Sequence, residues 1–347
     1  MKKILILHTG GTFGMVKIKP SEILAPNQMQ ERITAHVPEL ERVAKIDFQA
    51  LFNLDSANVQ PRHWQELATT IHENMDHYDG FVVIHGTDAL AYSAAALSFM
   101  LQNLPRPVIL TGSQRPLAEI RTDARSNLIN AVELATYPIP EVCIFFGTRL
   151  FRGNRAVKTS TIDYGAFESP NYPPLAEVGL DVRLANDLLL TPGDALQLRT
   201  AISDRVVMLS FFPGLPPDNL RCLFETPVQA IVIRGLGLGN LAVQEKSFVP
   251  LIEELTNAGK LVVITSQSYH GRVDLSRYEN TQLIEAAGAL DAGDMTTEAT
   301  IVKLMHLLGQ YPEDIPEVRR QFPLPIAGEI TPAPAPQSPA PEYAGDL

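Results

Sequence analysis

The sequence predicts an α/β protein with a larger N-terminal domain, built on a doubly wound and mostly parallel sheet, and a smaller C-terminal α/β domain. Short apolar strands alternate with helical segments along most of the chain, which is typical of βαβ units. A chain of 347 residues also exceeds the size of one compact core, so two domains are expected.

Three of the apolar strands run directly into a cluster that contains threonine or serine and glycine. The clusters are Thr9-Gly10-Gly11-Thr12, His85-Gly86-Thr87-Asp88 and Thr111-Gly112-Ser113-Gln114. Because the carboxyl ends of parallel strands form one edge of a sheet, these clusters are expected to converge on one small ligand.

The N-terminal domain is expected to span residues 1–183. Its strands are predicted at 4–7, 48–54, 81–84, 108–110 and 142–146, and its helices at 61–75, 89–101 and 123–135. This order of strands and helices implies right-handed crossovers and a parallel sheet. Residues 15–26 contain Pro20, Ser21 and Pro26, so they are expected to form a lid loop before a helix that opens within 28–35.

The regular pattern lapses between Leu180 and Asp204, where a connection or small hairpin is expected. We therefore assign residues 184–204 to an interdomain connection and 205–330 to a C-terminal α/β domain. Its buried strands are predicted at 206–211, 230–233 and 261–265, and its helices at 247–257 and 297–308. Residues 331–347 are rich in Pro and Ala and are predicted to be a disordered tail.

Composition argues against several kinds of partner and location. The chain has 28 Lys plus Arg against 39 Asp plus Glu, a formal charge of −11, which disfavours nucleic acid and anionic membranes as partners. Cys143 and Cys222 are about eighty positions apart, which fits neither a disulfide framework nor a zinc site. The apolar run at 4–7 is shorter than the roughly 7 to 15 residues of a signal-peptide core. A cytoplasmic location is therefore expected.

Familiar motifs for nucleotide and serine chemistry are missing. The sequence has no G-x-G-x-x-G after its first strand, no Walker A pattern and no G-x-S-x-G elbow. His72 and His77 are five residues apart, which does not place both on one helix face, so no metal pair is expected. The sequence thus predicts neither a metal nor a cofactor.

The strand-end clusters indicate hydroxyl chemistry. A threonine hydroxyl is a weak nucleophile unless a neighbouring group takes its proton during attack. Thr87 and Asp88 would supply a second hydroxyl and a carboxylate suited to holding a substrate ammonium. The simpler interpretation of each cluster is a helix N-cap and a turn, and an Asx turn explains Asp55 equally well.

Five segments together resemble the bacterial L-asparaginases, especially their cytoplasmic type I branch, from about Lys3 to about Glu329. They are the segments 9–12 (TGGT), 85–88 (HGTD), 111–117 (TGSQRPL), 152–155 (RGNR) and 293–296 (GDMT). The resemblance implies hydrolysis of L-asparagine to L-aspartate and ammonia without a cofactor, by a homodimer or homotetramer.

The resemblance also implies a role for individual residues. Thr12 would attack the side-chain amide and form an acyl-enzyme ester, which water then hydrolyses. Thr87, Asp88 and Lys158 would form a second reactive group that moves protons or activates water. The residues implied to contact the substrate are Gly11, Asp55, Ser56, Ala57, Thr87 and Asp88, with Asn240 presented toward a neighbouring subunit's site.

The sequence departs from the family pattern at several positions. Many members carry a tyrosine on the loop after T-G-G-T that activates the nucleophile, and residues 15–30 contain none. Arg234 matches the effector site of the type I branch, but Val157 and Ser268 stand where that branch can use threonine and cysteine.

Three alternatives to an asparaginase follow. A glutaminase or mixed amidase would differ only by tolerance of one methylene, which a pocket discriminates by roughly 1 to 3 kcal/mol. A catalytically weak asparagine sensor would explain the missing tyrosine. The amidase-like subunit of a tRNA-dependent amidotransferase would carry a further domain before T-G-G-T, which begins here at residue 9.

Overall fold

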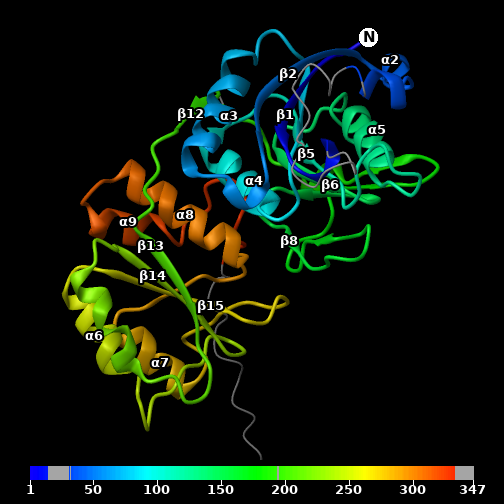
Figure 1. The fold of residues 1–347 in the computed structure, drawn as a ribbon. Helices are drawn as coiled ribbons and strands as arrows, with labels where there is room; N and C mark the ends of the chain where they lie inside the picture. Colours follow the sequence, from blue (N-terminus) through cyan, green and yellow to red (C-terminus); the bar gives the residue numbers. More distant parts are fainter. Residues whose placement is uncertain (15–30, 32, 194, 333–347) are drawn as a thin grey trace, which may run out of the picture.

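The computed structural model describes residues 1–14, 31, 33–193 and 195–332, and places two sheets in separate lobes (Figure 1). The N-terminal lobe contains an eight-stranded sheet in the order β11-β10-β7-β6-β5-β3-β1-β2, and the C-terminal lobe contains a four-stranded sheet in the order β13-β14-β15-β16. The predicted fold class is confirmed.

The central strands of the larger sheet are parallel, and those at one end are antiparallel. The parallel strands are β1 (Lys3–Gly10), β2 (Lys45–Leu54), β3 (Gly80–Ile84), β5 (Val108–Thr111) and β6 (Val142–Phe146). The antiparallel strands that follow are β7 (Arg149–Arg152), β10 (Ala176–Val178) and β11 (Val182–Leu184). Parallel pairing brings the ends of β1, β3 and β5 to one edge.

Helices cover both faces of this sheet, so alternate strand residues enter two separate cores. Leu5 and Leu7 pack in one core with residues of α3 (Pro61–Glu73) and α4 (Leu90–Met100). Ile4 and Ile6 pack on the other face with residues of α2 (Leu40–Val43) and α5 (Ala124–Leu134). Burial on both faces explains why these strands are continuous apolar runs in the sequence.

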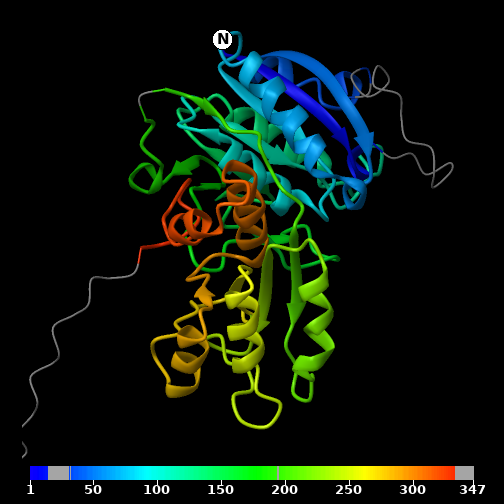
Figure 2. The ribbon, with the colours of Figure 1, turned by 90° about the vertical axis from the view of Figure 1, so that its left-hand side faces the viewer.

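The smaller sheet is parallel and also covered on both faces. Its strands are β13 (Val206–Ser210), β14 (Ala230–Gly235), β15 (Leu261–Ser266) and β16 (Leu290–Asp291). Helices α6 (Val249–Asn257) and α7 (Glu279–Ala286) contribute to one core, and α8 (Thr297–Gln310) and α9 (Ile315–Gln321) to the other. Val302 of α8 also enters the N-terminal core beside α4, so α8 lies between the lobes (Figure 2).

The remaining described elements are short. Two antiparallel pairs join β4 (Leu101–Gln102) to β12 (Gln197–Leu198), and β8 (Val157–Lys158) to β9 (Phe167–Glu168). The 3₁₀ helices are η1 (Thr12–Gly14), η2 (Ser56–Asn58), η3 (Asn186–Leu188) and η4 (Pro217–Glu225).

Two sequence-based expectations require correction. Strand β13 is not fully buried: it is an edge strand with a neighbour on one side only, and Met208 is 39% exposed. The hairpin expected after Leu180 is β10–β11, which starts earlier, at Ala176, and belongs to the edge of the N-terminal sheet. Helices α2, α7 and α9 were not predicted.

Other expectations stay predictions. The lid loop at 15–26 and residues 333–347 of the predicted tail lie outside the described residues, and the domain boundaries at 183, 204 and 330 are untested. The start of the tail requires correction, because Thr331 is held by hydrogen bonds to Asp294 and Arg155. Within the described part of the chain, no helix is both long and apolar enough to cross a membrane.

Candidate active site

The ends of β1 and β3 touch through their glycines. Gly10 and Gly11 have φ of +112° and +85°, a region that side chains with a Cβ rarely adopt. A Cβ on Gly11 would lie 2.4 Å from Gly86 Cα, and one on Gly86 would lie 2.7 Å from Ser56 Cβ. Glycine is therefore required at 11 and 86 for three strand ends to meet.

The threonines of the strand-end clusters are not equivalent. Thr9 and Thr111 are buried, and their hydroxyls donate to the carbonyl oxygens of Ile84 (3.0 Å) and Phe145 (2.9 Å). Both therefore join neighbouring strands. Our expectation that the Thr111 cluster also caps a helix is wrong, because the N-cap residue of α5 is Asp123.

Thr87 lies in a different environment. Lys158 Nζ on β8 donates to Thr87 Oγ1 at 2.9 Å and forms an ion pair with Asp88 Oδ1 at 2.6 Å. The Lys158 side chain is 16% exposed and that of Asp88 is 67% exposed, so the group opens to solvent. The N-cap residue of α4 is Ala89, which excludes the simpler interpretation of Thr87 as a cap.

Thr12 begins η1 at the end of β1 and is half-buried. No side chain in the described part of the chain donates to or accepts from its hydroxyl. The Gly11 N–H donates to Leu54 O at 3.0 Å, so any role of Gly11 toward a ligand comes from its small size rather than from its N–H.

Asp55 and Ser56 follow β2 on the same edge. Asp55 Oδ1 accepts from Ala57 N at 2.9 Å, which is the Asx turn that the sequence allowed. Ser56 is buried, and its Oγ accepts from the N–H groups of Asp88 (3.2 Å) and Ala89 (3.4 Å). Ser56 thus fixes the position of the Thr87-Asp88 segment, a role that the sequence did not reveal.

A chain of buried hydrogen bonds that includes His85 also stabilises the Thr87-Asp88 segment. His85 Nδ1 lies 2.7 Å from Gly86 O, Ser93 Oγ lies 3.0 Å from His85 Nε2, and Trp64 Nε1 donates to Ser93 Oγ at 2.8 Å. Since a carbonyl can only accept, we assign the proton to Nδ1, and Ser93 donates to Nε2. Burial lowers the pKa of His85 to about 4, so the ring is neutral at pH 7.

The end of β5 is held by a carboxylate that sequence analysis also missed. Asp123 accepts from the N–H groups of Gln114 and Arg115 at 2.9 to 3.1 Å. The Gln114 amide then donates to Ser160 O and Asp163 O, both at 3.3 Å. The loop after β5 is thereby joined to the loop after Lys158. The only signal in the sequence was an aspartate just before a helix.

Two residues carried over from the resemblance lie apart from this group. Asn240 closes a turn with Leu236 through backbone hydrogen bonds, and no contact in the described residues joins it to Thr87, Asp88 or Lys158. Arg234 lies near the end of β14, and its Nε has no partner among the described residues. The described residues also contain no cluster of three or more side chains suited to a metal.

Glycines let the ends of β1, β2 and β3 meet at one edge of the sheet, which we call the rim, and the hydroxyl, carboxylate and amine groups of Thr12, Thr87, Asp88 and Lys158 lie there. This arrangement defines a class of protein: a two-domain α/β enzyme for a small polar substrate. The comparisons identify the family. The asparaginase N-terminal model matches residues 3–189, and the glutaminase/asparaginase C-terminal domain model matches residues 205–322.

Individual proteins that are similar to this chain indicate the same family. The chain is 39% identical over 336 residues to L-asparaginase 1 of Escherichia coli K12, covering 95% of this chain and 98% of that protein. The structure resembles the thermostable L-asparaginase of Thermococcus kodakarensis (TM-score 0.87, 35% identity, 95% and 100% coverage) and L-asparaginase I of Vibrio cholerae (TM-score 0.86, 36% identity, 95% and 99% coverage). The chain belongs to the L-asparaginase family of amidohydrolases, and the resemblance noted in the sequence is confirmed.

Proposed function

We propose that this enzyme hydrolyses L-asparagine to L-aspartate and ammonia through an ester on Thr12. The observation that supports this most strongly is the contact of Lys158 with both Thr87 and Asp88 on the rim where β1 also ends. It supplies a polarised hydroxyl, an amine and an exposed carboxylate beside the Thr12 segment.

In the first step, Thr12 Oγ attacks the carbon of the substrate's side-chain amide. A C–O bond forms, the hydroxyl proton is transferred to the leaving nitrogen, and the C–N bond breaks to release ammonia. Backbone N–H groups that face the oxyanion typically contribute about 3 to 4 kcal/mol each. Asp88 and Ala89 already donate to Ser56, whereas the Thr87 N–H has no acceptor in the described structure, and we assign it as a donor to the oxyanion.

In the second step, water attacks the ester carbon, a proton of the water is passed to Thr12 Oγ, and the bond between that carbon and Thr12 Oγ breaks to release L-aspartate. Because Lys158 donates to Thr87 Oγ1, the Thr87 hydroxyl hydrogen points away from the lysine and is free to donate to Thr12 Oγ as that oxygen leaves. Thr87 and Lys158 then form a short path for the proton, and Asp88 orients the amine. A positioned acid–base pair of this kind contributes about 10² to 10⁴ in rate.

Substrate binding uses groups with unused hydrogen-bonding capacity. Ser56 Oγ accepts two N–H groups, so its own hydrogen remains to donate to the substrate α-carboxylate. Asp55 uses Oδ1 in its turn and keeps Oδ2 for the ammonium, together with Asp88. Gly11 leaves room for the substrate backbone, and Ala57 lines the same edge.

We further propose a cytoplasmic homodimer or homotetramer in which Asn240 reaches the site of a neighbouring subunit. Its place beside the exposed residues Leu236 and Gly237, with its described hydrogen bonds confined to that turn, supports a role outside its own subunit. The free cysteines Cys143 and Cys222 fit a reducing compartment.

Arg234 is proposed as an effector contact for the α-carboxylate of an amino acid. Its Nε and the Oε2 atom of Glu298 are buried and have no hydrogen-bond partner among the residues that the structure describes, and burial raises the pKa of Glu298. The nearby cavity lined by Val157 and Ser268 has a volume of about 20 Å³, enough for one water, so effector binding would require it to widen.

The test is ammonia release from L-asparagine, L-glutamine and D-asparagine over a range of concentrations, with Thr12→Ala beside the wild type. We expect L-asparagine to give the highest kcat/KM, and Thr12→Ala to lower kcat by about 10³ or more. A higher kcat/KM for glutamine would establish a glutaminase instead. Calorimetric binding of asparagine without ammonia release would establish a sensor, and a sigmoidal rate curve would support the effector site.

A further inference from the structure

The turn that precedes the proposed catalytic lysine is unusually polar for a buried segment. Residues 152–155 run from the end of β7 toward β8, and all four are buried, including Arg152 and Arg155. The turn is closed by a hydrogen bond from Arg155 N to Arg152 O at 3.0 Å. Buried arginines are rare unless each is paired, so their partners indicate what this turn is built to hold.

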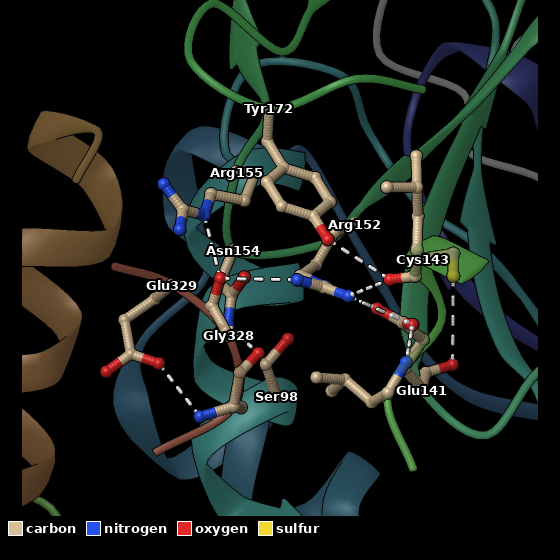
Figure 3. A network of polar contacts seen from close by, with 12 residues as sticks. Ser98, Glu141, Cys143, Arg152, Asn154, Arg155, Tyr172, Gly328 and Glu329 are labelled. Carbon is tan, nitrogen blue, oxygen red and sulfur yellow. Dashed lines mark hydrogen bonds and ion pairs between the residues drawn. The ribbon is translucent and has the colours of Figure 1, made fainter. Parts of the chain in front are cut away.

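The Arg155 guanidinium is held by groups of the C-terminal domain and by Thr331, the residue that follows it. Its Nη1 forms an ion pair with Asp294 Oδ2 at 2.9 Å, its Nε donates to Gly328 O at 2.7 Å, and its Nη2 donates to Thr331 Oγ1 at 3.1 Å. We call Arg155, Asp294, Gly328 and Thr331 the interdomain clamp. Figure 3 shows Arg155 and Arg152 beside the ring of Tyr172. The guanidinium carbon Cζ lies 4.4 Å from the centroid of that ring in Arg152 and 5.2 Å from it in Arg155.

The partners of Arg155 are themselves fixed. Asp294 Oδ1 accepts from Thr331 N at 2.8 Å, so one carboxylate holds both the arginine and the C-terminal segment. That segment is anchored in turn by Glu329, which pairs with Lys303 of α8 at 2.5 Å in a fully buried contact. Arg155 is therefore attached to a rigid part of the C-terminal domain.

Charge favours this arrangement at neutral pH. Burial would raise the pKa of Asp294, but hydrogen bonds from Thr331 and the charge of Arg155 outweigh it and lower the pKa below its usual value. Burial lowers the pKa of Arg155 from its ordinary value, and Asp294 opposes that shift. Both groups are charged at pH 7, which keeps the clamp closed.

The clamp is close to Lys158 along the chain. Three residue steps separate Arg155 from Lys158, about 10 Å of extended chain. In between, β8 is a two-residue strand that pairs only with β9, so its own ladder holds it weakly. The lysine must nevertheless bring one nitrogen within 2.9 Å of Thr87 and 2.6 Å of Asp88.

We infer that Arg155 is a positioning residue: through Asp294, the C-terminal domain sets where β8 begins and thereby holds Lys158 against Thr87 and Asp88. The inference rests on the proposed role of Lys158. Arg155 touches no reacting group, so its effect is on turnover rather than on substrate affinity.

The test measures kcat, KM and thermal stability of the full-length chain for Arg155→Lys and Asp294→Asn, well below the unfolding temperature. Arg155→Lys keeps the charge but loses the planar fork that reaches three partners. Because a displacement of about 1 Å in a catalytic group can cost about 10²-fold, we expect kcat to fall by about 10- to 100-fold. KM should change by less than about threefold.

Arg152→Lys is the matched control. Arg152 lies beside the same turn, is equally buried and contacts the same tyrosine, but its ion pair is with Glu141 of its own domain. Its contact with the clamp is a hydrogen bond from Nη1 to Gly328 O at 3.4 Å, longer than the 2.7 Å bond from Arg155, and it makes no ion pair with Asp294. We expect its stability loss to resemble that of Arg155→Lys while its kcat stays within about twofold of the wild type. A kcat that simply follows stability across all three variants would overturn the inference.

A double variant separates this inference from the proposed function. If Arg155 acts through Lys158, Arg155→Lys should lower kcat no further once Lys158→Met is present, whereas an equal additional loss would overturn the inference alone. Near-normal turnover in Lys158→Met itself would overturn the proposed role of the lysine, and the inference with it. Should Arg155→Lys fail to fold, Asp294→Asn combined with Lys158→Met gives the same comparison.

Discussion

The active-site rim and the interdomain clamp use the same chemical groups in opposite surroundings. Each joins a cation to a carboxylate and a threonine hydroxyl: Lys158 with Asp88 and Thr87, and Arg155 with Asp294 and Thr331. Asp88 is 67% exposed, whereas Asp294 is 10% exposed. An exposed pair contributes little to stability and can exchange partners with a ligand, whereas breaking a buried pair is costly. Thr87 and Lys158 are only 7% and 16% exposed, so it is the exposure of the carboxylate that distinguishes the proposed reactive group from the clamp.

The largest effect on the rim is expected from Lys158→Met. Removing the amine should lower kcat by about 10² to 10⁴ because Thr87 loses its proton partner, while the melting temperature stays within about 2 °C of the wild type. Steady-state ammonia release and calorimetry measure both. A large loss of stability with normal kcat would reverse the roles assigned to the two regions.

The converse is expected beside the clamp. Lys303→Met leaves Glu329 buried without its cation, which typically costs about 3 to 5 kcal/mol of unfolding free energy. Burial lowers the pKa of Lys303, so part of that cost is already present in the native pair. Denaturant unfolding should show the loss. Lys2→Met, at an exposed ion pair, is the control and should change stability by less than about 0.5 kcal/mol.

Acid should weaken the cores rather than the rim. Burial lowers the pKa of His8, His85 and His306 to about 4, against about 6.5 when unfolded. Between pH 6.5 and pH 4 the unfolded chain therefore binds protons that the folded chain does not bind, and the free energy of unfolding falls as the pH drops. Each histidine should cost about 2 kcal/mol between pH 6.5 and pH 5. Unfolding of His306→Gln at both pH values should show a decline smaller by that amount, and an unchanged decline would contradict the assignment.

The smallest effect is expected at the buried threonine of the rim. Thr111→Val removes a hydroxyl that donates to Phe145 O and should cost about 1 kcal/mol of stability, with kcat changed by less than about threefold. Thr111→Ser keeps the hydroxyl and isolates the effect of the methyl group. A loss of kcat as large as that expected for Thr12→Ala would show that Thr111 is not merely structural.

The sequence predicted the parts of the site that local patterns encode. Apolar runs that end in Thr-Gly clusters located Thr12, Thr87 and Asp88 on the rim, and the resemblance added Lys158. The resemblance also named Ser56, but its hydrogen bonds from two N–H groups could not be predicted, because these partners lie more than thirty residues away along the chain. The Arg155–Asp294 contact spans an even longer separation.

The same limit applies to the fold. The long apolar strands were predicted because burial on both faces makes them continuous runs. Helix α7 was missed because, of its eight residues, only Thr281 and Ile284 are buried, so its helical periodicity is weak. Strand β13 was assigned to the interior because composition does not distinguish an edge strand from a central one.

The division between Thr12 as nucleophile and Thr87 as proton relay is tested most directly by trapping the ester. Enzyme quenched in acid during turnover of L-asparagine should carry the added mass of one aspartyl group, and peptide mapping should locate it on the segment that contains Thr12. The ester should accumulate in Lys158→Met if that lysine assists its hydrolysis. An ester on the Thr87 segment, or none in any quenched sample of an active enzyme, would contradict the proposed mechanism.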